Sequence, residues 1–412
     1  MRSEFSQLWQ KVVVESERAR EVVSKHAHVT PLNPSSTLSR IAGGKVFLKY
    51  ENLQKTGSFK VRGALYKVSQ QIGRVKGVVA ASAGNHAQGV AYASSAFGLR
   101  SVIVMPETAS ISKIEATKSY GAEVVLHGRV FDEAMLKALE IAKERGYEFV
   151  PAFDDVSVIA GQGTVGWELL EQADLDLVVV PVGGGGLIAG IAAVMKRFKP
   201  SVKVIGVEAE AAPKMTASLK AGRPVSIDPK PSVADGLLTK RPGELTFAIA
   251  SELVDEMVTV DEEEISQAIY FLLERKKALT EGAGAVGVAA LLAGKLKLEG
   301  KRSAIVLSGG NIDLTVLNKI LIRGLSRAGK IVRLVGQVPD YSGQLKRVLD
   351  IVASKRANVL DVLHDRVDLS LPPWHAKVVL LLEVPSVAVA EEIVRELEKD
   401  GYSFSLERGP RE

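Results

Sequence analysis

The chain has 412 residues, of which 46% are hydrophobic and 25% are charged, and its formal net charge is +5. This length suits two or three domains, and the basic residues are spread out rather than clustered, so we expect no nucleic-acid partner. The absence of cysteine excludes disulfides, thiolate zinc sites and cysteine-ligated iron–sulfur clusters, and it fits a reducing compartment. No run of about eighteen apolar residues and no signal-peptide core occur, so we expect a cytoplasmic protein without a membrane partner.

From about residue 46 to residue 330, short β-branched strands alternate with glycine-containing loops and alanine-rich helices. Strands that are apolar nearly throughout are typical of parallel sheets covered on both faces. We therefore predict a doubly wound α/β architecture, in which ligands bind where strands end and helices begin. The predicted strands are Val46–Tyr50, Gly77–Ala81, Ser101–Met105, Glu123–Leu126, Leu177–Val182, Lys203–Glu208 and Ala304–Leu307, and the helices include Gln88–Phe97, Glu133–Glu144 and Leu187–Phe198.

The pattern changes after about residue 329. A strand, a turn at 339–343 and a helix are followed by two strands, a second helix that begins at Ser386, and a closing strand. The order β-α-β-β-α-β over about 80 residues predicts a ferredoxin-like module. Its strands are expected at 330–338, about 358–371, about 376–384 and 402–406, with 327–330 as the linker.

Lys60 is the first candidate for chemistry. It follows the strand Val46–Tyr50, and its neighbours are Phe59 and, three residues on, Gly63. The polar residues 56–58 can cap a helix, and Phe59 places an apolar ring beside the amine. Most lysines are solvated surface charges, but a desolvated lysine has a lowered pKa and is nucleophilic toward carbonyl compounds.

The loop after the next strand, Ala81–Gln88, carries Ser82, Asn85 and His86. Small residues let backbone amides approach a ligand, and the following helix directs its positive end toward it, which suits a carboxylate. The simpler alternative is a strand-to-helix turn with Asn85 as the cap and His86 on the helix flank. This segment alone does not decide between the two.

A third loop, Gly183–Gly186, joins a buried strand to the apolar helix that begins at Leu187. Glycines here cost folding entropy without aiding packing, whereas exposed amides at a helix N-terminus bind phosphate. A dinucleotide-binding loop is the competing interpretation. Spacing does not exclude it, because Glu208 ends a strand about 22 residues after Gly186.

The fourth loop, Ser308–Asn311, follows the strand Ala304–Leu307. The Ser308 hydroxyl can face a ring nitrogen, or it can cap the next helix. Glu281 offers a carboxylate among small residues, with a plain helix start as its alternative. Together the loops supply an amine, an anion pocket, a phosphate cradle and a ring partner, which a pyridoxal-phosphate enzyme acting on an amino acid needs.

In this order the four loops resemble the threonine dehydratase (threonine ammonia-lyase) family, which has the tryptophan-synthase-β-like, fold type II pyridoxal-phosphate fold. The resemblance covers about residues 20–325 and includes Gly161-Gln-Gly-Thr164. It implies two doubly wound α/β domains within residues 1–329, the smaller (about 47–150) inserted into the larger (about 1–46 and 151–329). Residues 330–412 are similar to an ACT domain, an amino-acid-sensing module.

The resemblance also implies roles for single residues. Lys60 forms the Schiff base with pyridoxal 5′-phosphate and later takes the Cα proton. Phe59 packs on the cofactor ring, Asn85 bonds its 3′-hydroxyl, and Ser308 faces its pyridine nitrogen. The phosphate is held by the backbone amides of Gly183, Gly184, Gly185, Gly186 and Leu187, and the substrate carboxylate by Ser82, Asn85 and His86.

The implied reaction is β-elimination of water from an amino acid. It converts L-threonine to 2-oxobutanoate and ammonia, and L-serine to pyruvate. A serine opposite the ring nitrogen does not keep that nitrogen protonated as a carboxylate would. Expelling the β-hydroxyl as the Cα proton leaves is then the favoured route.

Serine racemase, which shares the fold, is the main alternative. Racemisation needs a second acid–base group, which is a serine after Ser82 in that family, whereas this chain has Ala83. Racemase-like members bind a divalent cation beyond the strand that ends at Glu208, but Lys214 replaces the last acid here, so no metal is predicted. A catalytically silent amino-acid sensor conflicts with the intact loops, and threonine synthase would need a further basic cluster.

The ACT-like module implies regulation by an amino acid such as isoleucine or valine. Tyr341-Ser342 replaces the arginine–proline pair often found in its turn, which leaves the effector open. Such modules pair, so a homodimer or homotetramer is expected. A part in isoleucine biosynthesis is one interpretation, and a degradative role is the other.

Overall fold

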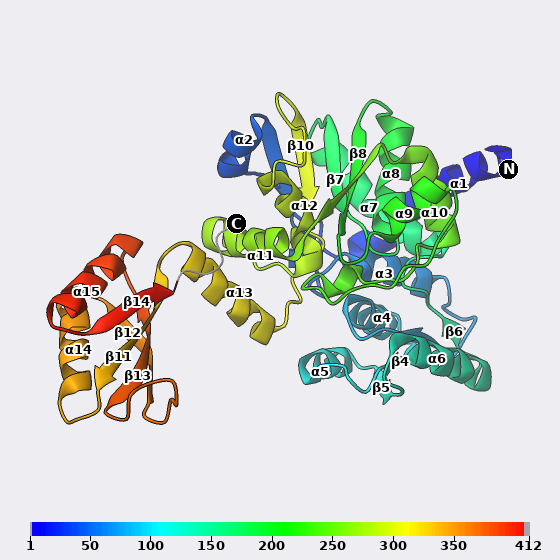
Figure 1. Cartoon of the computed structure of the whole chain (residues 1–412). Helices are drawn as coiled ribbons and strands as arrows, with labels where there is room; N and C mark the ends of the chain where they lie inside the picture. Colours follow the sequence, from blue (N-terminus) through cyan, green and yellow to red (C-terminus); the bar gives the residue numbers. More distant parts are fainter. Residues whose placement is uncertain (1, 408–412) are drawn as a thin grey trace. The chain divides into compact units, whose positions relative to one another are not determined.

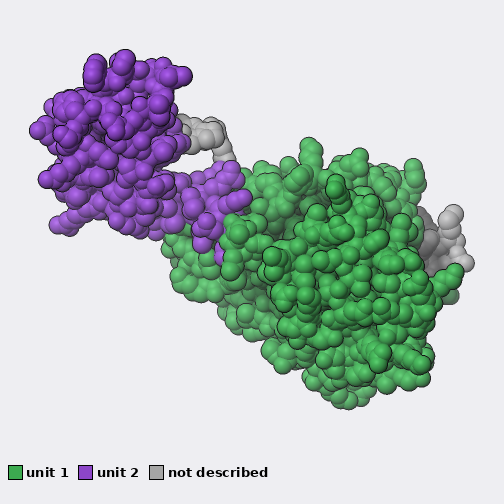
Figure 2. Space-filling model, turned by 90° about the horizontal axis from the view of Figure 1, so that it is seen from below, with its two compact units in different colours: residues 1–316 green, residues 317–412 purple. Residues whose placement is uncertain are grey.

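The computed structural model describes residues 2–407 of the chain. The described chain divides into two compact units, with the boundary between Val316 and Leu317 (Figure 2). Between residues 2 and 407, no helix combines the length and the apolar character that crossing a bilayer demands. The first unit is α/β with parallel sheets and the second is an antiparallel sheet with two helices, so the predicted fold class is confirmed (Figure 1).

The larger sheet of the first unit has six strands in the order β1-β2-β10-β7-β8-β9. Only β1 pairs antiparallel, and the other neighbours are parallel. The strands are β1 (Leu32–Pro34), β2 (Lys45–Lys49), β7 (Leu177–Pro181), β8 (Lys203–Ala209), β9 (Glu256–Val260) and β10 (Arg302–Val306). The helices around it are α1 (Arg2–His26), α2 (Ser36–Ala42), α7 (Val156–Gln172), α8 (Gly186–Phe198), α9 (Lys214–Ala221), α10 (Glu244–Leu253), α11 (Glu262–Phe271) and α12 (Gly282–Leu292), with short turns η1 (Glu51–Leu53), η2 (Asp235–Leu237) and η3 (Leu272–Lys276).

Alternate residues of the central strands face different helices. Val178 and Val180 belong to the core formed with α1, α7, α8 and α10. Val179 and Ile305 point the other way, where the α-carbon of Gly287 in α12 approaches them so closely that an added Cβ would lie 2.6 Å from Ile305. Both faces of β7 and β10 are therefore covered, which is why β7 is apolar throughout and β10 is apolar from Ala304 to Val306.

The smaller sheet has the order β5-β4-β3-β6, and all its pairs are parallel. Val78 and Ala80 pack with α3 and α4, while Val79 and Ala81 pack with α6. The strands are β3 (Gly77–Ala81), β4 (Arg100–Met105), β5 (Glu123–Leu126) and β6 (Glu148–Phe149), and the helices are α3 (Lys60–Ser69), α4 (Asn85–Ala96), α5 (Ile111–Ser119) and α6 (Phe131–Arg145). Helix α13 (Leu314–Arg327) crosses the boundary between the units.

The second unit has the element order β-α-β-β-α-β and the sheet order β12-β13-β11-β14. Residues Val348 and Val352 of one helix, and Ile393 and Leu397 of the other, recur at helical spacing and are buried against one face of the sheet. The elements are β11 (Ile331–Pro339), α14 (Gln344–Ser354), β12 (Asn358–Asp365), β13 (His375–Glu383), α15 (Val387–Lys399) and β14 (Ser403–Glu407).

Three boundaries differ from the expected ones. Strand β2, expected at the start of the smaller domain, pairs with β1 and β10 in the larger sheet. The compact units separate after Val316, inside α13, and not at residue 329. Strand β12 ends at Asp365, before the expected residue 371, because the Asp365 carboxylate accepts from the Val367 amide and turns the chain there.

Candidate active site

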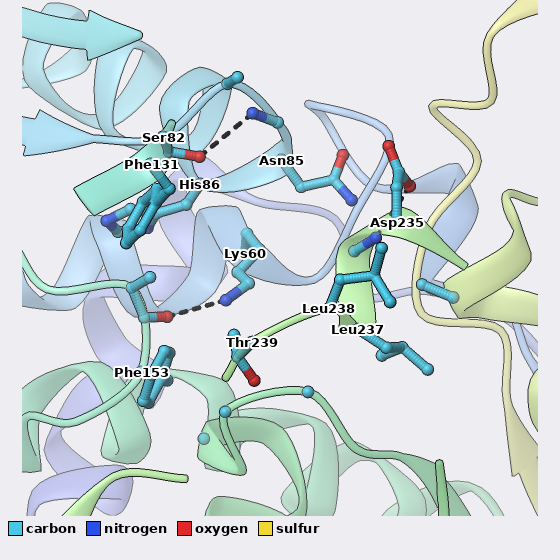
Figure 3. A pocket seen from close by; sticks show the side chains of 18 of the residues that line it. Lys60, Ser82, Asn85, His86, Phe131, Phe153, Asp235, Leu237, Leu238 and Thr239 are labelled. Carbon is cyan, nitrogen blue, oxygen red and sulfur yellow. Dashed lines mark hydrogen bonds between the residues drawn. The ribbon is translucent and has the colours of Figure 1, made fainter. Parts of the chain in front are cut away.

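A cavity of about 570 Å³ lies in the first unit and is lined by all four predicted loops (Figure 3). The parallel strands that precede these loops end on the same side of their sheets, so segments distant in sequence meet there. Every residue with a predicted role lines the cavity, namely Phe59, Lys60, Ser82, Asn85, His86, Gly183, Gly184, Gly185, Gly186, Leu187 and Ser308.

Lys60 is the first residue of α3 and its side chain lies in the middle of the cavity (Figure 3). The loop that presents it is fixed to the Ser308 loop, because the Phe59 amide donates to the Ser308 carbonyl at 3.1 Å and Ser58 bridges to Gly309. The Lys60 Nζ donates to the Ala152 carbonyl at 2.8 Å. Desolvation lowers the pKa of Lys60 to about 8, against the opposing influence of the Glu281 carboxylate.

Arg62 fastens this helix to η1 and α7. Its fully buried guanidinium donates twice to the Glu51 carboxylate, at 2.8 and 2.7 Å, and once to Glu168 at 2.6 Å. Bidentate contacts of this kind restrict rotation as well as distance. The first turn of α3, and with it Lys60, is therefore held in a defined position.

Asn85 connects the second loop to two others. Its Nδ2 donates to Glu281 Oε1 at 2.6 Å, and its Oδ1 accepts from Asn311 Nδ2 at 2.7 Å. Asn311 also donates to the Thr56 carbonyl at 2.8 Å, just before the Lys60 loop. Burial raises the pKa of Glu281 to about 7, with Asp235 adding to the effect. Glu281, which the sequence marks only as a carboxylate of open function, is thus part of the site.

The two other polar residues of that loop have defined partners. Ser82 Oγ accepts from the Gly84 amide at 3.1 Å (Figure 3). His86 Nε2 lies 2.9 Å from the Val150 carbonyl. Burial lowers the pKa of His86 to about 3, and the charge of Lys60 contributes. The imidazole is therefore neutral. Its proton is on Nε2, which donates to the Val150 carbonyl.

The glycine loop is closely surrounded. A Cβ on Gly184 would lie 2.4 Å from the Phe153 ring, and one on Gly186 would lie 2.4 Å from Gln162 Oε1. Gly185 has a φ of 98°, a left-handed conformation that side chains disfavour. Both amide atoms of buried Gln162 and the Thr239 hydroxyl have no hydrogen-bond partner within residues 2–407. This part of the cavity is built for a ligand with several acceptor and donor atoms.

The profile of the family "Pyridoxal-phosphate dependent enzyme" matches residues 23–309. The chain belongs to this family. An L-threonine ammonia-lyase of Thermotoga maritima is 50% identical over 391 residues, which cover 94% of this chain and 97% of the relative. The processed form of threonine deaminase isoform 2 from Solanum lycopersicum superposes with a TM-score of 0.72 at 39% identity, covering 76% of this chain and 87% of that one. Maize serine racemase gives 0.71 at 33% identity, covering 76% and 98%.

Pyridoxal 5′-phosphate is accordingly the cofactor, and the residues present fit it. Side chains at Gly184 and Gly186 would collide with Phe153 and Gln162, so this loop keeps bare backbone amides, which a phosphate can approach. The unpartnered groups of Gln162 and Thr239 line the same cavity. Lys60 supplies the amine that the cofactor aldehyde requires. A dinucleotide site would leave this lysine without a function, and the family match decides for pyridoxal phosphate.

Several cavity residues escape prediction from the sequence. The sequence points to Gln162 only as part of the family pattern at residues 161–164. No motif in the sequence points to Phe153 or Thr239. Lys113 of α5 and Asp235 of η2 form an ion pair of 2.7 Å at the cavity, 122 residues apart in sequence. Between residues 2 and 407 no cluster of three or more metal-binding side chains occurs.

Proposed function

We propose that the protein is a threonine ammonia-lyase, which converts L-threonine to 2-oxobutanoate and ammonia by β-elimination of water. The observation that carries the proposal is the position of Lys60. Its amine lies in a cavity that also holds the glycine cradle and the Ser82–Asn85 loop. The 50% identity to an L-threonine ammonia-lyase over nearly the whole chain supports the choice of reaction.

We propose that the cofactor is held by the residues named from the sequence. The amides of Gly183 to Leu187 would bind its phosphate, Phe59 would pack on its ring, and Ser308 and Asn85 would bond its polar edge atoms. When bound, pyridoxal phosphate withdraws electrons from the carbon that bears the amino group, which makes its proton removable.

Lys60 is the group that takes this proton. A pKa of about 8 leaves a useful fraction of neutral amine at neutral pH, and the same value makes the protonated form a good acid for the return step. Ser308 Oγ is a neutral hydroxyl that donates to the Ala283 carbonyl at 3.3 Å. Since it brings no charge to the cofactor, prompt loss of the β-hydroxyl is favoured over accumulation of negative charge.

The substrate carboxylate is proposed to bind at the loop from Ser82 to His86, at the N-terminus of α4. Because the His86 imidazole is neutral and bonded to Val150, attraction comes from backbone amides and not from a charged ring. Glu281 would hold the Asn85 amide in its orientation through the 2.6 Å bond.

Serine racemase is the alternative with which the fold agrees, but Ala83 supplies no second proton-transfer group. The test is an assay of keto acid and of D-amino acid with L-threonine, L-serine, D-threonine and D-serine. We expect 2-oxobutanoate from L-threonine, pyruvate from L-serine, and no D-serine. Formation of D-serine from L-serine at a rate comparable to keto acid would contradict the proposal.

We further propose that the module at 330–412 is an ACT-like unit that binds an amino-acid effector such as isoleucine or valine. A homodimer or homotetramer and a cytoplasmic location belong to the same proposal. The β-α-β-β-α-β order of its elements supports it. Deleting residues 330–412 should leave threonine turnover and remove the effector response; a response that survives the deletion would refute the regulatory role.

A further inference from the structure

Lys214 is a fully buried lysine that lies outside the cavity lining. It is the first residue of α9. Its Nζ donates to the carbonyls of Val182 at 2.9 Å, Ala212 at 3.1 Å and Leu237 at 2.9 Å. The Glu208 carboxylate lies 3.3 Å away.

The contacts define the charge of this group. Three carbonyl acceptors require three N–H donors, and a lysine has three only as an ammonium ion. Glu208 is likewise an anion, because its carboxylate accepts from the amides of Met215 and Thr216 and from the Thr216 hydroxyl. Burial lowers the pKa of Lys214, and the attraction of Glu208 opposes this. A cation is thus enclosed entirely by oxygen atoms.

Two of these oxygen atoms, the carbonyls of Val182 and Leu237, come from segments that border the cofactor cradle. Val182 directly precedes Gly183, the first residue of the glycine loop. Leu237 belongs to η2, which also lines the cavity, and the η2 residue Gly236 has its carbonyl 3.2 Å from the position of a Cβ on Gly183. The ammonium therefore connects the glycine loop to η2 without lining the cavity in which the ligand would bind.

We propose that the Lys214 ammonium is a built-in cation that positions the glycine loop and η2 for cofactor binding. Its partners, the carbonyls of Val182, Ala212 and Leu237 and the Glu208 carboxylate, form an oxygen cage that also suits a free cation. Carbonyl and carboxylate oxygens are the ligands that hard cations such as K⁺, Mg²⁺ and Ca²⁺ prefer. The wild-type protein then needs no added cation. Without the lysine side chain, the same oxygens are left to repel one another unless a cation enters.

The proposal rests on the proposed function only in that the glycine loop binds the cofactor phosphate. It is tested on the full-length protein with K214A, which empties the cage, and K214M, which fills it with an uncharged side chain of similar length. The control is K196A, because Lys196 also donates to a carbonyl (Val202, 2.8 Å) and pairs with an acid (Asp255, 2.8 Å) but does not line the cofactor cavity. The readouts are the dissociation constant for pyridoxal phosphate and the melting temperature.

Each protein is measured with EDTA alone and with the chlorides of K⁺, NH₄⁺, Mg²⁺ or Ca²⁺, using choline chloride to match ionic strength. We expect wild type and K196A to be indifferent to these salts. K214A should bind pyridoxal phosphate at least about tenfold more weakly in EDTA and regain most of the loss with a cation that fits. K214M should bind weakly in every salt, because its side chain occupies the cage.

Three results would overturn the proposal: wild-type affinity in K214A, a loss that no cation restores, or equal rescue of K214A and K214M. If K214A does not fold in EDTA, its refolding yield with each cation is the readout, and failure in all of them refutes the proposal. A wild-type protein that binds the cofactor but does not deaminate threonine would refute the proposed function and leave this comparison interpretable.

Discussion

The surroundings of Lys60 and of Lys214 show how one residue type is put to two uses in the same unit. Lys60 lies in a cavity, has one carbonyl partner, and has a pKa lowered to about 8. Lys214 has three carbonyl partners and a carboxylate, and does not line that cavity. Desolvation disfavours both ammonium ions, but only the second has an oxygen acceptor for each of its three N–H groups. We infer that a buried lysine is reactive when the protein leaves some of its N–H groups without acceptors, and that burial alone does not make it reactive.

The largest effect is expected from K60A. Removing the amine should lower threonine turnover by about 10³-fold or more, because the proton acceptor and the attachment point are lost together. The melting temperature of the cofactor-free protein should stay close to wild type, since Lys60 contributes one carbonyl contact. Steady-state kinetics and thermal unfolding check both statements. Substantial activity in K60A would break the assignment of Lys60 as the reactive lysine.

The next effect tests the cradle that we infer Lys214 supports. In G184A the new methyl group would have its Cβ 2.4 Å from the Phe153 ring, so we expect roughly tenfold or greater weakening of pyridoxal-phosphate binding. G183A is the matched control, because its Cβ would be 3.2 Å from the nearest atom, the Gly236 carbonyl oxygen. Absorbance titration measures both affinities. Equal losses in the two variants would argue against a closely fitted loop at Gly184.

The smallest effect concerns the pKa of Lys60. Because only the neutral amine attacks an aldehyde, cofactor uptake by the apoprotein should accelerate about tenfold per pH unit below pH 8 and level off above it. An ordinary lysine would show a rising rate until beyond pH 10. The wild-type profile is measured by stopped-flow absorbance.

The variant E281Q sharpens the same measurement. Glu281 raises the Lys60 pKa through its negative charge, so the break should move to lower pH by about half to one unit. The carboxyl has its own pKa of about 7, so the difference should be visible between about pH 7 and pH 8; it should fade below pH 7, where Glu281 is protonated, and above pH 8, where Lys60 is neutral in both proteins. The exposed residue Glu115 offers a control, as E115Q should leave the break in place. A break that moves upward would contradict the charge argument.

Much of this could be predicted from sequence, because the signals are local. Strands β3 and β7 are apolar throughout, β10 is apolar from Ala304 onward, and a loop of the site directly follows each of them, so the elements and their convergence were predictable together. The pattern β-α-β-β-α-β of the second unit is readable for the same reason. What the sequence could not reveal are pairings over long distances. Strand β2 pairs with β10 some 257 residues later (Lys45 with Arg302), and Asn85 meets Glu281 across 196 residues.

Lys214 shows why the contacts of a buried side chain cannot be predicted from the sequence. From the sequence it is only a lysine in the place of an expected acid, and its oxygen partners are carbonyls of residues 32, 2 and 23 positions away. Carbonyl oxygens leave no trace in a sequence, because every residue has one. The same holds for the single carbonyl that Lys60 meets at Ala152, so the different fates of the two lysines become visible only in the folded chain.

The most direct measurement locates the cofactor on the chain. The holoenzyme is reduced with borohydride, digested, and the peptides that carry a phosphopyridoxyl group are identified by mass spectrometry. The account predicts one modified residue, Lys60, in stoichiometric amount, and an unmodified Lys214. Modification at Lys214 or another lysine, with Lys60 unmodified, would contradict it.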